Sequence, residues 1–142
     1  MLIEREQIRR LIPHAGKMCL LDGLLEWDAQ RIACVARSHR ASDNPLRRDG
    51  RLRAVCGIEY AAQAMALHGG LSAQPGSRAR AGYLASVRDL ICRVAFLDDA
   101  GAELRIFAER LLAQGDRVIY AFGIDDSGRE LLAGRAAVVL NV

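Results

Sequence analysis

The sequence predicts an α+β protein in which a curved, six-stranded antiparallel sheet wraps around one long central helix. Residues 55–68 have the length of a helix and are apolar or small on almost every face, so this segment belongs in the interior. Two strand-like segments precede the helix and four follow it, with turn residues between them. One helix cannot cover both faces of a sheet, whereas a sheet that curves around it buries a helix that lacks a polar face.

Before the long helix the chain is expected to form a short amphipathic helix, two strands and a polar loop: residues 4–11, 18–27, 31–38 and 40–53. A turn at residues 28–30 predicts that the two strands pair as a hairpin. The dipeptides Asn44-Pro45 and Asp49-Gly50 are turn signals, so the following loop is expected to bend before it enters the long helix.

The long helix is expected to end at Gly69-Gly70, because glycine readily ends a helix. Four strands are expected after it: residues 80–94, 103–112, 116–124 and 131–142. Turn residues at 114–116 and 125–128 predict that the last three strands form an antiparallel meander. These elements fit a single domain over residues 1–142, which is long enough to bury a sizeable core.

Composition and charge exclude several classes of protein. The chain is 51% hydrophobic and 26% charged with a formal net charge of +3, as in soluble globular proteins. No apolar run reaches the roughly 20 residues of a membrane span, and the charged N-terminus lacks the apolar core of a signal peptide, so a cytoplasmic location is expected. The basic stretch at 47–53 is short and has no interleaved aromatic residues, so no nucleic acid is expected as a partner.

The cysteines and histidines show no metal-binding pattern. The four cysteines are widely spaced with no C-x-x-C pair, and they are expected to be small buried hydrophobic residues. The three histidines lack the H-x-x-x-H spacing that brings two ligands onto one helix face. No metal site is therefore predicted.

Glu59 is the only carboxylate in the long apolar helix. Burying a carboxylate costs several kcal/mol unless it is paired, hydrogen-bonded or protonated, so stability alone favours an apolar residue at this position. Gln63 lies four residues further on, one turn along the same helix face. The alternative is that Glu59 only complements the positive end of the helix dipole, an effect of about 0.3–1 kcal/mol. Burial makes Glu59 the first candidate for a functional residue.

Three motifs occur in the order that a known family shows. Residues 11–22 read LIPHAGKMCLLD and are similar to a segment L-P-H-x-x-P-x-L-L-V-D, and residues 59–63 read EYAAQ and are similar to E-A-M-A-Q. Asn44-Pro45 is similar to the N-E-P that ends a second strand. On these motifs the chain resembles the hot-dog 3-hydroxyacyl-ACP dehydratases, most closely the divergent branch found in aryl-polyene-type pigment clusters. The resemblance covers essentially the whole chain and implies the hot-dog fold.

The resemblance implies a lyase that dehydrates 3-hydroxyacyl thioesters on acyl carrier protein to trans-2-enoyl thioesters, in fatty-acid-like or polyene pigment biosynthesis. It places the catalytic carboxyl at Glu59. The family's loop motif H-F-P-G-x-P-x-x-P-G, whose histidine is the base, is replaced here by residues 46–55, which contain no histidine. His14 is the favoured substitute, because its segment runs close to the active-site tunnel in this fold, and His39 is the alternative. His68 is expected to meet the helix dipole at the C-terminal end.

Dehydration needs a base for the proton alpha to the carbonyl and an acid for the departing hydroxyl. His14 is assigned as the base, and Glu59 as the acid. The N–H groups at the start of the helix are expected to meet the thioester oxygen as negative charge develops on it. The substrate-binding residues expected on this basis are Asn44, Gly57, Ile58 and Gln63. No cofactor is expected beyond the phosphopantetheine arm of the carrier protein.

The resemblance also implies partners. A homodimer is expected, formed through the long strand at residues 80–94, and a second hot-dog subunit is an alternative partner. The carrier protein is acidic, so Arg47, Arg48, Arg51 and Arg53 are expected either to dock it or to form a solvated loop. Two other functions stay open: an acyl thioesterase, and a non-catalytic carrier-binding subunit, which the missing loop histidine favours.

Overall fold

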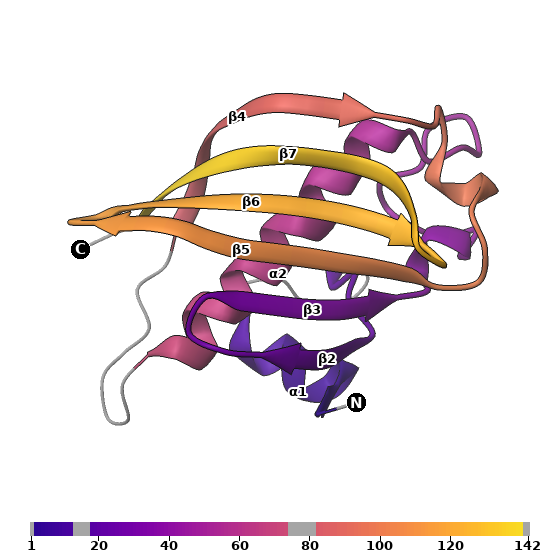
Figure 1. The fold of residues 1–142 in the computed structure, drawn as a ribbon. Helices are drawn as coiled ribbons and strands as arrows, with labels where there is room; N and C mark the ends of the chain where they lie inside the picture. Colours follow the sequence, from indigo (N-terminus) through magenta and orange to yellow (C-terminus); the bar gives the residue numbers. More distant parts are fainter. Residues whose placement is uncertain (1, 13–17, 74–81, 141–142) are drawn as a thin grey trace.

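The computed structural model describes residues 2–12, 18–73 and 82–140 and confirms the α+β hot-dog architecture (Figure 1). The strands are β1 (Ile3–Glu4), β2 (Gly23–Trp27), β3 (Arg31–Ala36), β4 (Gly82–Cys92), β5 (Leu104–Gln114), β6 (Arg117–Asp126) and β7 (Arg129–Leu140). The helices are α1 (Arg5–Leu11) and α2 (Gly57–Ser72), with the short 3-10 turns η2 (Ser38–Arg40), η3 (Ala54–Cys56) and η4 (Leu97–Asp99).

The sheet is antiparallel throughout, with the strand order β1-β2-β3-β5-β6-β7-β4. It holds the six predicted strands and the two-residue strand β1, in which Ile3 pairs with Leu24 of β2. The predicted hairpin of β2 and β3 and the predicted meander of β5, β6 and β7 are both present. The tight turns of the meander contain Gly115 and Gly128 in the left-handed region, where glycine has no steric penalty.

Helix α2 crosses the concave face of the sheet and contacts β3, β5 and β6 (Figure 1). At its start, a Cβ on Gly57 would lie 2.5 Å from a Leu132 methyl and 2.9 Å from an Ile124 methyl. Both methyl groups belong to fully buried side chains. Gly57 therefore brings the first turn of α2 against β6 and β7, in a core packed too tightly for a side chain.

The predicted end of the long helix at Gly69-Gly70 is wrong, since α2 continues to Ser72. A Cβ on Gly70 would lie 3.3 Å from the carbonyl oxygen of Leu11, the last residue of α1. Close approach of α1 thus explains glycine at position 70, whereas a helix end does not. Because of this continuation His68 lies before the last turn of the helix, and the expectation that it meets the dipole at the C-terminal end is also wrong.

The predicted strand at residues 18–27 forms only from Gly23 onward. In the preceding residues, the polar groups of Met18 and Leu20 bind side chains of α2 and η2, while the Asp22 N–H donates to the Val35 carbonyl oxygen of β3. The strand pattern at residues 18–22 is therefore explained by burial of Cys19, Leu20 and Leu21.

Strand β4 forms one edge of the sheet and pairs only with β7 in the described chain. Its apolar side chains Tyr83, Leu84, Leu90 and Ile91 are 36–56% exposed. Cys92 is also exposed, which corrects the expectation that all four cysteines are buried. A long edge strand with exposed apolar side chains invites pairing with another chain. Among the described residues, no helix combines the length and the apolar character that crossing a bilayer requires.

Candidate functional site

Glu59 lies in the first turn of α2, inside the curved sheet. The residue is half-buried, and its Oε2 atom is shielded from solvent. Burial raises the pKa of the neighbouring Cys56 thiol, a shift that Arg48 and Arg53 oppose and that Glu59 supports. The first turn of α2 thus gathers a carboxyl group, a thiol and two guanidinium groups at the positive end of the helix dipole.

Gln63 is fully buried one turn beyond Glu59. Its Oε1 accepts a hydrogen bond from the Leu20 N–H at 2.8 Å, and its Nε2 donates to the Met18 carbonyl oxygen at 2.6 Å. Both ends of the amide therefore bind the backbone of the segment that leads into β2. This is a role that the motif by itself does not reveal.

Asn44 is buried and belongs to a second set of hydrogen bonds on the same side of α2. Its Nδ2 donates to the Ser38 carbonyl oxygen at 2.9 Å and to the Tyr60 hydroxyl at 3.0 Å, while its Oδ1 accepts from the Leu46 N–H at 2.9 Å. Both N–H donors of the amide are thus engaged within the protein. Asn44 holds the turn after η2 against Tyr60 of the helix.

The start of α2 is wound more tightly than expected. Turn η3 runs directly into the helix, so the Gly57 N–H donates to the carbonyl oxygens of Ala54 and Val55. This donor is therefore already used, and the close packing described above accounts for the glycine. Ile58 is half-buried in the first turn of α2, directly before Glu59 in the chain.

His39 is fully buried, with its Nε2 2.7 Å from the Gly101 carbonyl oxygen. Its Nδ1 is buried and has no hydrogen-bond partner among the described residues. Since a carbonyl oxygen only accepts, Nε2 carries the proton. Burial lowers the pKa of His39, with the hydrogen bond to Gly101 acting in the opposite direction. His39 is therefore a core residue whose Nε2 is engaged by the Gly101 carbonyl oxygen.

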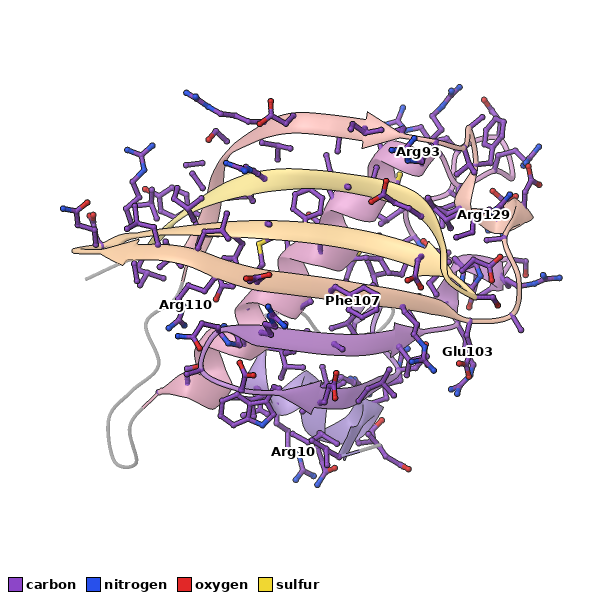
Figure 2. All side chains as sticks on the ribbon, in the orientation of Figure 1. Arg10, Arg93, Glu103, Phe107, Arg110 and Arg129 are labelled. Atoms are coloured by element: carbon purple, nitrogen blue, oxygen red, sulfur yellow. The ribbon has the colours of Figure 1, made fainter. Side chains whose placement is uncertain are left out.

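His68 is fully buried near the far end of α2. Its Nδ1 lies 2.7 Å from the Tyr120 hydroxyl, and its Nε2 lies 2.9 Å from the Asp28 carbonyl oxygen. Burial lowers the pKa of His68, and Arg110 of β5, 3.5 Å from Nδ1, lowers it further (Figure 2). His68 is thus a neutral bridge from the helix to the sheet.

The predicted arginine cluster divides into two pairs. Arg47 donates to three backbone carbonyl oxygens, those of His39, Ala41 and Gly50. Arg51 stacks on the ring of Phe96 and binds Asp98 and Asp99. These two guanidinium groups hold the loop together.

Arg48 and Arg53 form the other pair. Both are exposed, and their guanidinium groups form no hydrogen bond or ion pair with the described part of the chain. The guanidinium group of Arg53 lies 5.9 Å from the centre of the Phe96 ring, and both exposed charges can meet a partner beside the first turn of α2.

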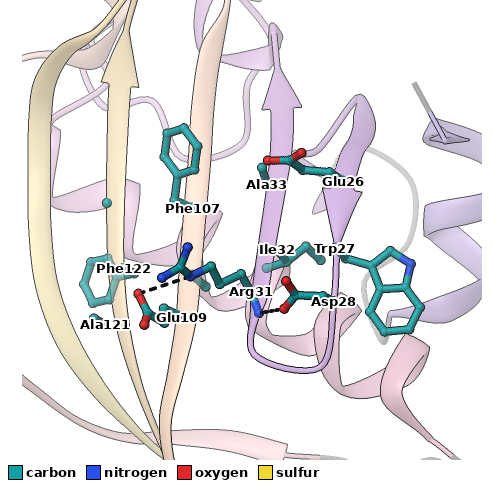
Figure 3. Close-up of a pocket in the computed structure, with 12 residues that line it drawn as sticks. Glu26, Trp27, Asp28, Arg31, Ile32, Ala33, Phe107, Glu109, Ala121 and Phe122 are labelled. Atoms are coloured by element: carbon teal, nitrogen blue, oxygen red, sulfur yellow. Dashed lines mark hydrogen bonds and ion pairs between the residues drawn. The ribbon is translucent and has the colours of Figure 1, made fainter.

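A cavity of about 640 Å³ opens over β2, β3, β5 and β6 (Figure 3). Its walls include Trp27 and Phe107, which are both partly exposed, and an ion pair of 3.6 Å between Arg31 and Glu109. Phe107 alternates along β5 with the buried Ile106, which faces α2, so the cavity lies on the outer face of the sheet. The predicted site residues that the structure describes do not line this cavity.

His14 lies outside the described residues, so its position relative to Glu59 stays a prediction. Tyr60, in contrast, is a site residue that the motif comparison passed over. A tyrosine in an otherwise apolar helix needs a partner for its hydroxyl, and this need is a signal in the sequence. Within the described ranges, no group of three or more His, Cys, Asp or Glu side chains converges to hold a metal ion.

Comparisons with known proteins identify the family and the fold. A family model described as ApeP-like, ApeP dehydratase, matches residues 6–141. The dehydratase heterocomplex ApeI:P from Xenorhabdus doucetiae is similar in structure, with a TM-score of 0.83 at 23% identity over 95% of this chain and 91% of that chain. A thioesterase from Haemophilus influenzae has a TM-score of 0.69 at 10% identity over 98% and 91% of the two chains. No curated protein matches significantly.

Proposed function

The chain belongs to the ApeP-like dehydratase family, and we propose that it dehydrates 3-hydroxyacyl thioesters on acyl carrier protein to trans-2-enoyl thioesters in polyene pigment biosynthesis. The observation that carries this proposal is the half-buried carboxyl group of Glu59, in the first turn of a helix that the sheet encloses. This setting suits a carboxyl group that works as an acid or a base in a site shielded from water.

In the proposed reaction, a base removes the proton from the carbon alpha to the thioester carbonyl. The carbon–oxygen bond of the 3-hydroxyl group breaks, Glu59 supplies the proton, and water leaves. The electron pair of the broken carbon–hydrogen bond forms the new double bond. Negative charge that develops on the thioester oxygen is stabilised by the positive end of α2 around Gly57 and Ile58.

His14 is the proposed base, and the other two histidines support this choice. His39 binds Gly101, and His68 binds Tyr120 and Asp28. The chain has only three histidines, so His14 is the remaining candidate for the base. Met18, four residues after His14, is held by Gln63 one turn from Glu59, so the connection is short enough for His14 to reach the site.

The exposed edge strand β4 supports an assembly with a second hot-dog subunit. Pairing along β4 would cover its apolar side chains and continue the sheet. The similar solved structure is a dehydratase heterocomplex, which favours a different hot-dog chain as the partner, with a homodimer as the alternative. The absence of histidine from residues 46–55 supports the same idea, because the partner would then bring a histidine of its own.

Mass spectrometry of 3-hydroxyacyl carrier protein incubated with this protein tests the proposal. The assay is run with the chain alone and with a hot-dog subunit that carries the loop histidine. Loss of one water by the chain alone supports the full catalytic role. Loss of water only with the partner subunit, unaffected by Glu59→Gln, supports a non-catalytic carrier-binding role. Release of the free carrier thiol identifies a thioesterase.

Replacing the exposed pair Arg48 and Arg53 is expected to weaken docking of the acidic carrier. In the double variant Arg48→Glu and Arg53→Glu, KM for the acyl carrier protein should rise about tenfold or more, because charge attraction becomes repulsion. Turnover of a small acyl-pantetheine thioester should not change, since it lacks the carrier. Steady-state kinetics with both substrates measures the difference.

The matched control is the double variant Arg117→Glu and Arg129→Glu, which makes the same charge change on two exposed arginines of β6 and β7. Equal losses in the two double variants would contradict a specific docking role. They would mean that only the net charge of the protein matters.

A further inference from the structure

Both polar groups of the Leu20 backbone are held by side chains. The N–H donates to Oε1 of Gln63 at 2.8 Å, and the carbonyl oxygen accepts from the Ser38 hydroxyl at 2.7 Å. Leu20 itself is fully buried, so water does not replace either partner. Two residues away, the Met18 carbonyl oxygen accepts from the other end of the Gln63 amide.

The Ser38 hydroxyl is held in turn by the helix. It lies 2.9 Å from the Tyr60 hydroxyl, which also accepts a hydrogen bond from Asn44 at 3.0 Å. Tyr60 and Gln63 are fully buried and lie three residues apart, on neighbouring positions of one helix face. The helix therefore holds residues 18–20 by hydrogen bonds at two points, directly through Gln63 and indirectly through Tyr60 and Ser38.

These hydrogen bonds come from helix residues that lie close to Glu59 in the chain. Gln63 lies four residues after Glu59 and three after Tyr60, so its side chain is a neighbour of both on the surface of α2. Backbone groups are normally satisfied by pairing within the sheet, as the residues of β2 are. Residues 18–20 instead lie beside α2, and buried polar side chains secure them there. Such an arrangement fixes a neighbouring wall of the site.

We propose that Gln63 and Tyr60 are positioning residues, which fix the backbone of residues 18–20 beside Glu59 and so set the geometry of the catalytic site without touching the substrate. This inference rests on the proposed function and assigns Gln63 a role other than substrate binding. Asn44 supports the same arrangement through the Tyr60 hydroxyl.

Kinetics of Gln63→Met and Tyr60→Phe tests the proposal, because each variant keeps its volume and loses its hydrogen bonds. Both are expected to lower kcat roughly 10- to 100-fold, since displaced catalytic groups react slowly, while KM for the acyl carrier protein stays unchanged. Amide hydrogen exchange at Leu20 should become about tenfold faster in Gln63→Met, which removes the acceptor.

The matched control is Tyr120→Phe. Tyr120 is a buried tyrosine that also loses a hydrogen bond in this variant, but its partner His68 lies further along α2. The control should keep the kcat of the unchanged protein and its exchange rate at Leu20. An equal fall of kcat in Tyr120→Phe would overturn the proposal, because a general loss of stability would then explain the kinetics.

Two further outcomes decide the role of Gln63. A raised KM with unchanged kcat in Gln63→Met would show direct substrate contact and overturn the proposal. Unchanged exchange at Leu20 in that variant would overturn it as well, whatever the activity. If the unchanged protein dehydrates nothing, with or without a partner subunit, the proposed function fails, and the exchange rate at Leu20 still reports whether Gln63 holds the segment.

Discussion

The Glu59→Gln variant is expected to lose dehydration by about 10²- to 10⁴-fold, the contribution typical of a general acid. Glutamine keeps the size of the side chain and its polarity, but its amide cannot supply a proton to the departing hydroxyl group. The half-buried position of Glu59 in the first turn of α2 means that bulk water is a poor substitute for the lost acid. Mass spectrometry of the acyl carrier protein over time measures the rate.

Glu26→Gln is the matched control. Glu26 is an exposed carboxylate of β2 that lines the cavity on the outer face of the sheet. The control should keep full activity and full stability. Retention of more than a third of the original rate in Glu59→Gln would contradict the acid role, provided that thermal unfolding shows a folded variant.

The second large expected effect is a fall in the free energy of unfolding as the pH is lowered. His39 and His68 are both fully buried, and burial lowers the pKa of each below its ordinary value of 6.5. Protonation of His68 would place a positive charge 3.5 Å from the Arg110 guanidinium group. Protonation of His39 would put a proton on a buried Nδ1 that has no acceptor among the described residues. Both folded environments therefore favour the neutral ring.

The direction of the pH effect follows from proton binding. As the pH falls below about 6.5, the unfolded chain binds protons on these two histidines while the folded protein does not. The free energy of unfolding is therefore expected to fall with pH, by up to about 1.4 kcal/mol per pH unit for each histidine. The loss continues until the pH reaches the lowered pKa of the folded state. Urea unfolding at several pH values between 8 and 5 measures it.

Replacing the histidines separates their effect from that of other groups. His39→Gln keeps a donor for the Gly101 carbonyl oxygen and removes the titration, so the pH slope should decrease even if stability at pH 8 is lower. His68→Gln should decrease the slope in the same way. A constant or rising free energy of unfolding between pH 7 and 5.5 in the unchanged protein would refute neutral burial of these rings.

Much of the fold follows from periodicity alone. Alternating residues predicted β5 and β6 to within a few residues, because buried side chains recur at every second position over much of each strand. The prediction was least accurate where apolar residues are buried without belonging to a strand. Cys19, Leu20 and Leu21 are apolar because they are enclosed. They were expected to form part of a strand, whereas the Leu20 backbone binds side chains.

In the candidate site, too, the sequence predicted some features and not others. The sequence pointed to Glu59, because a single carboxylate in an apolar helix is costly unless it has a use. It did not indicate that Gln63 binds the backbone of Leu20, 43 residues earlier. Nor did it separate Arg47, which holds its loop together, from the exposed Arg48 beside it.

The sequence by itself therefore determined the hot-dog architecture and the place of Glu59 in it, since both depend on local pattern and on the polarity of single residues. Only the tertiary structure decided which polar side chains are already engaged. His39 meets Gly101 across 62 residues of chain, and His68 meets Tyr120 across 52. The physical reason is that hydrogen bonds depend on distances of about 3 Å between groups that folding brings together, and the spacing of residues along the chain does not contain those distances.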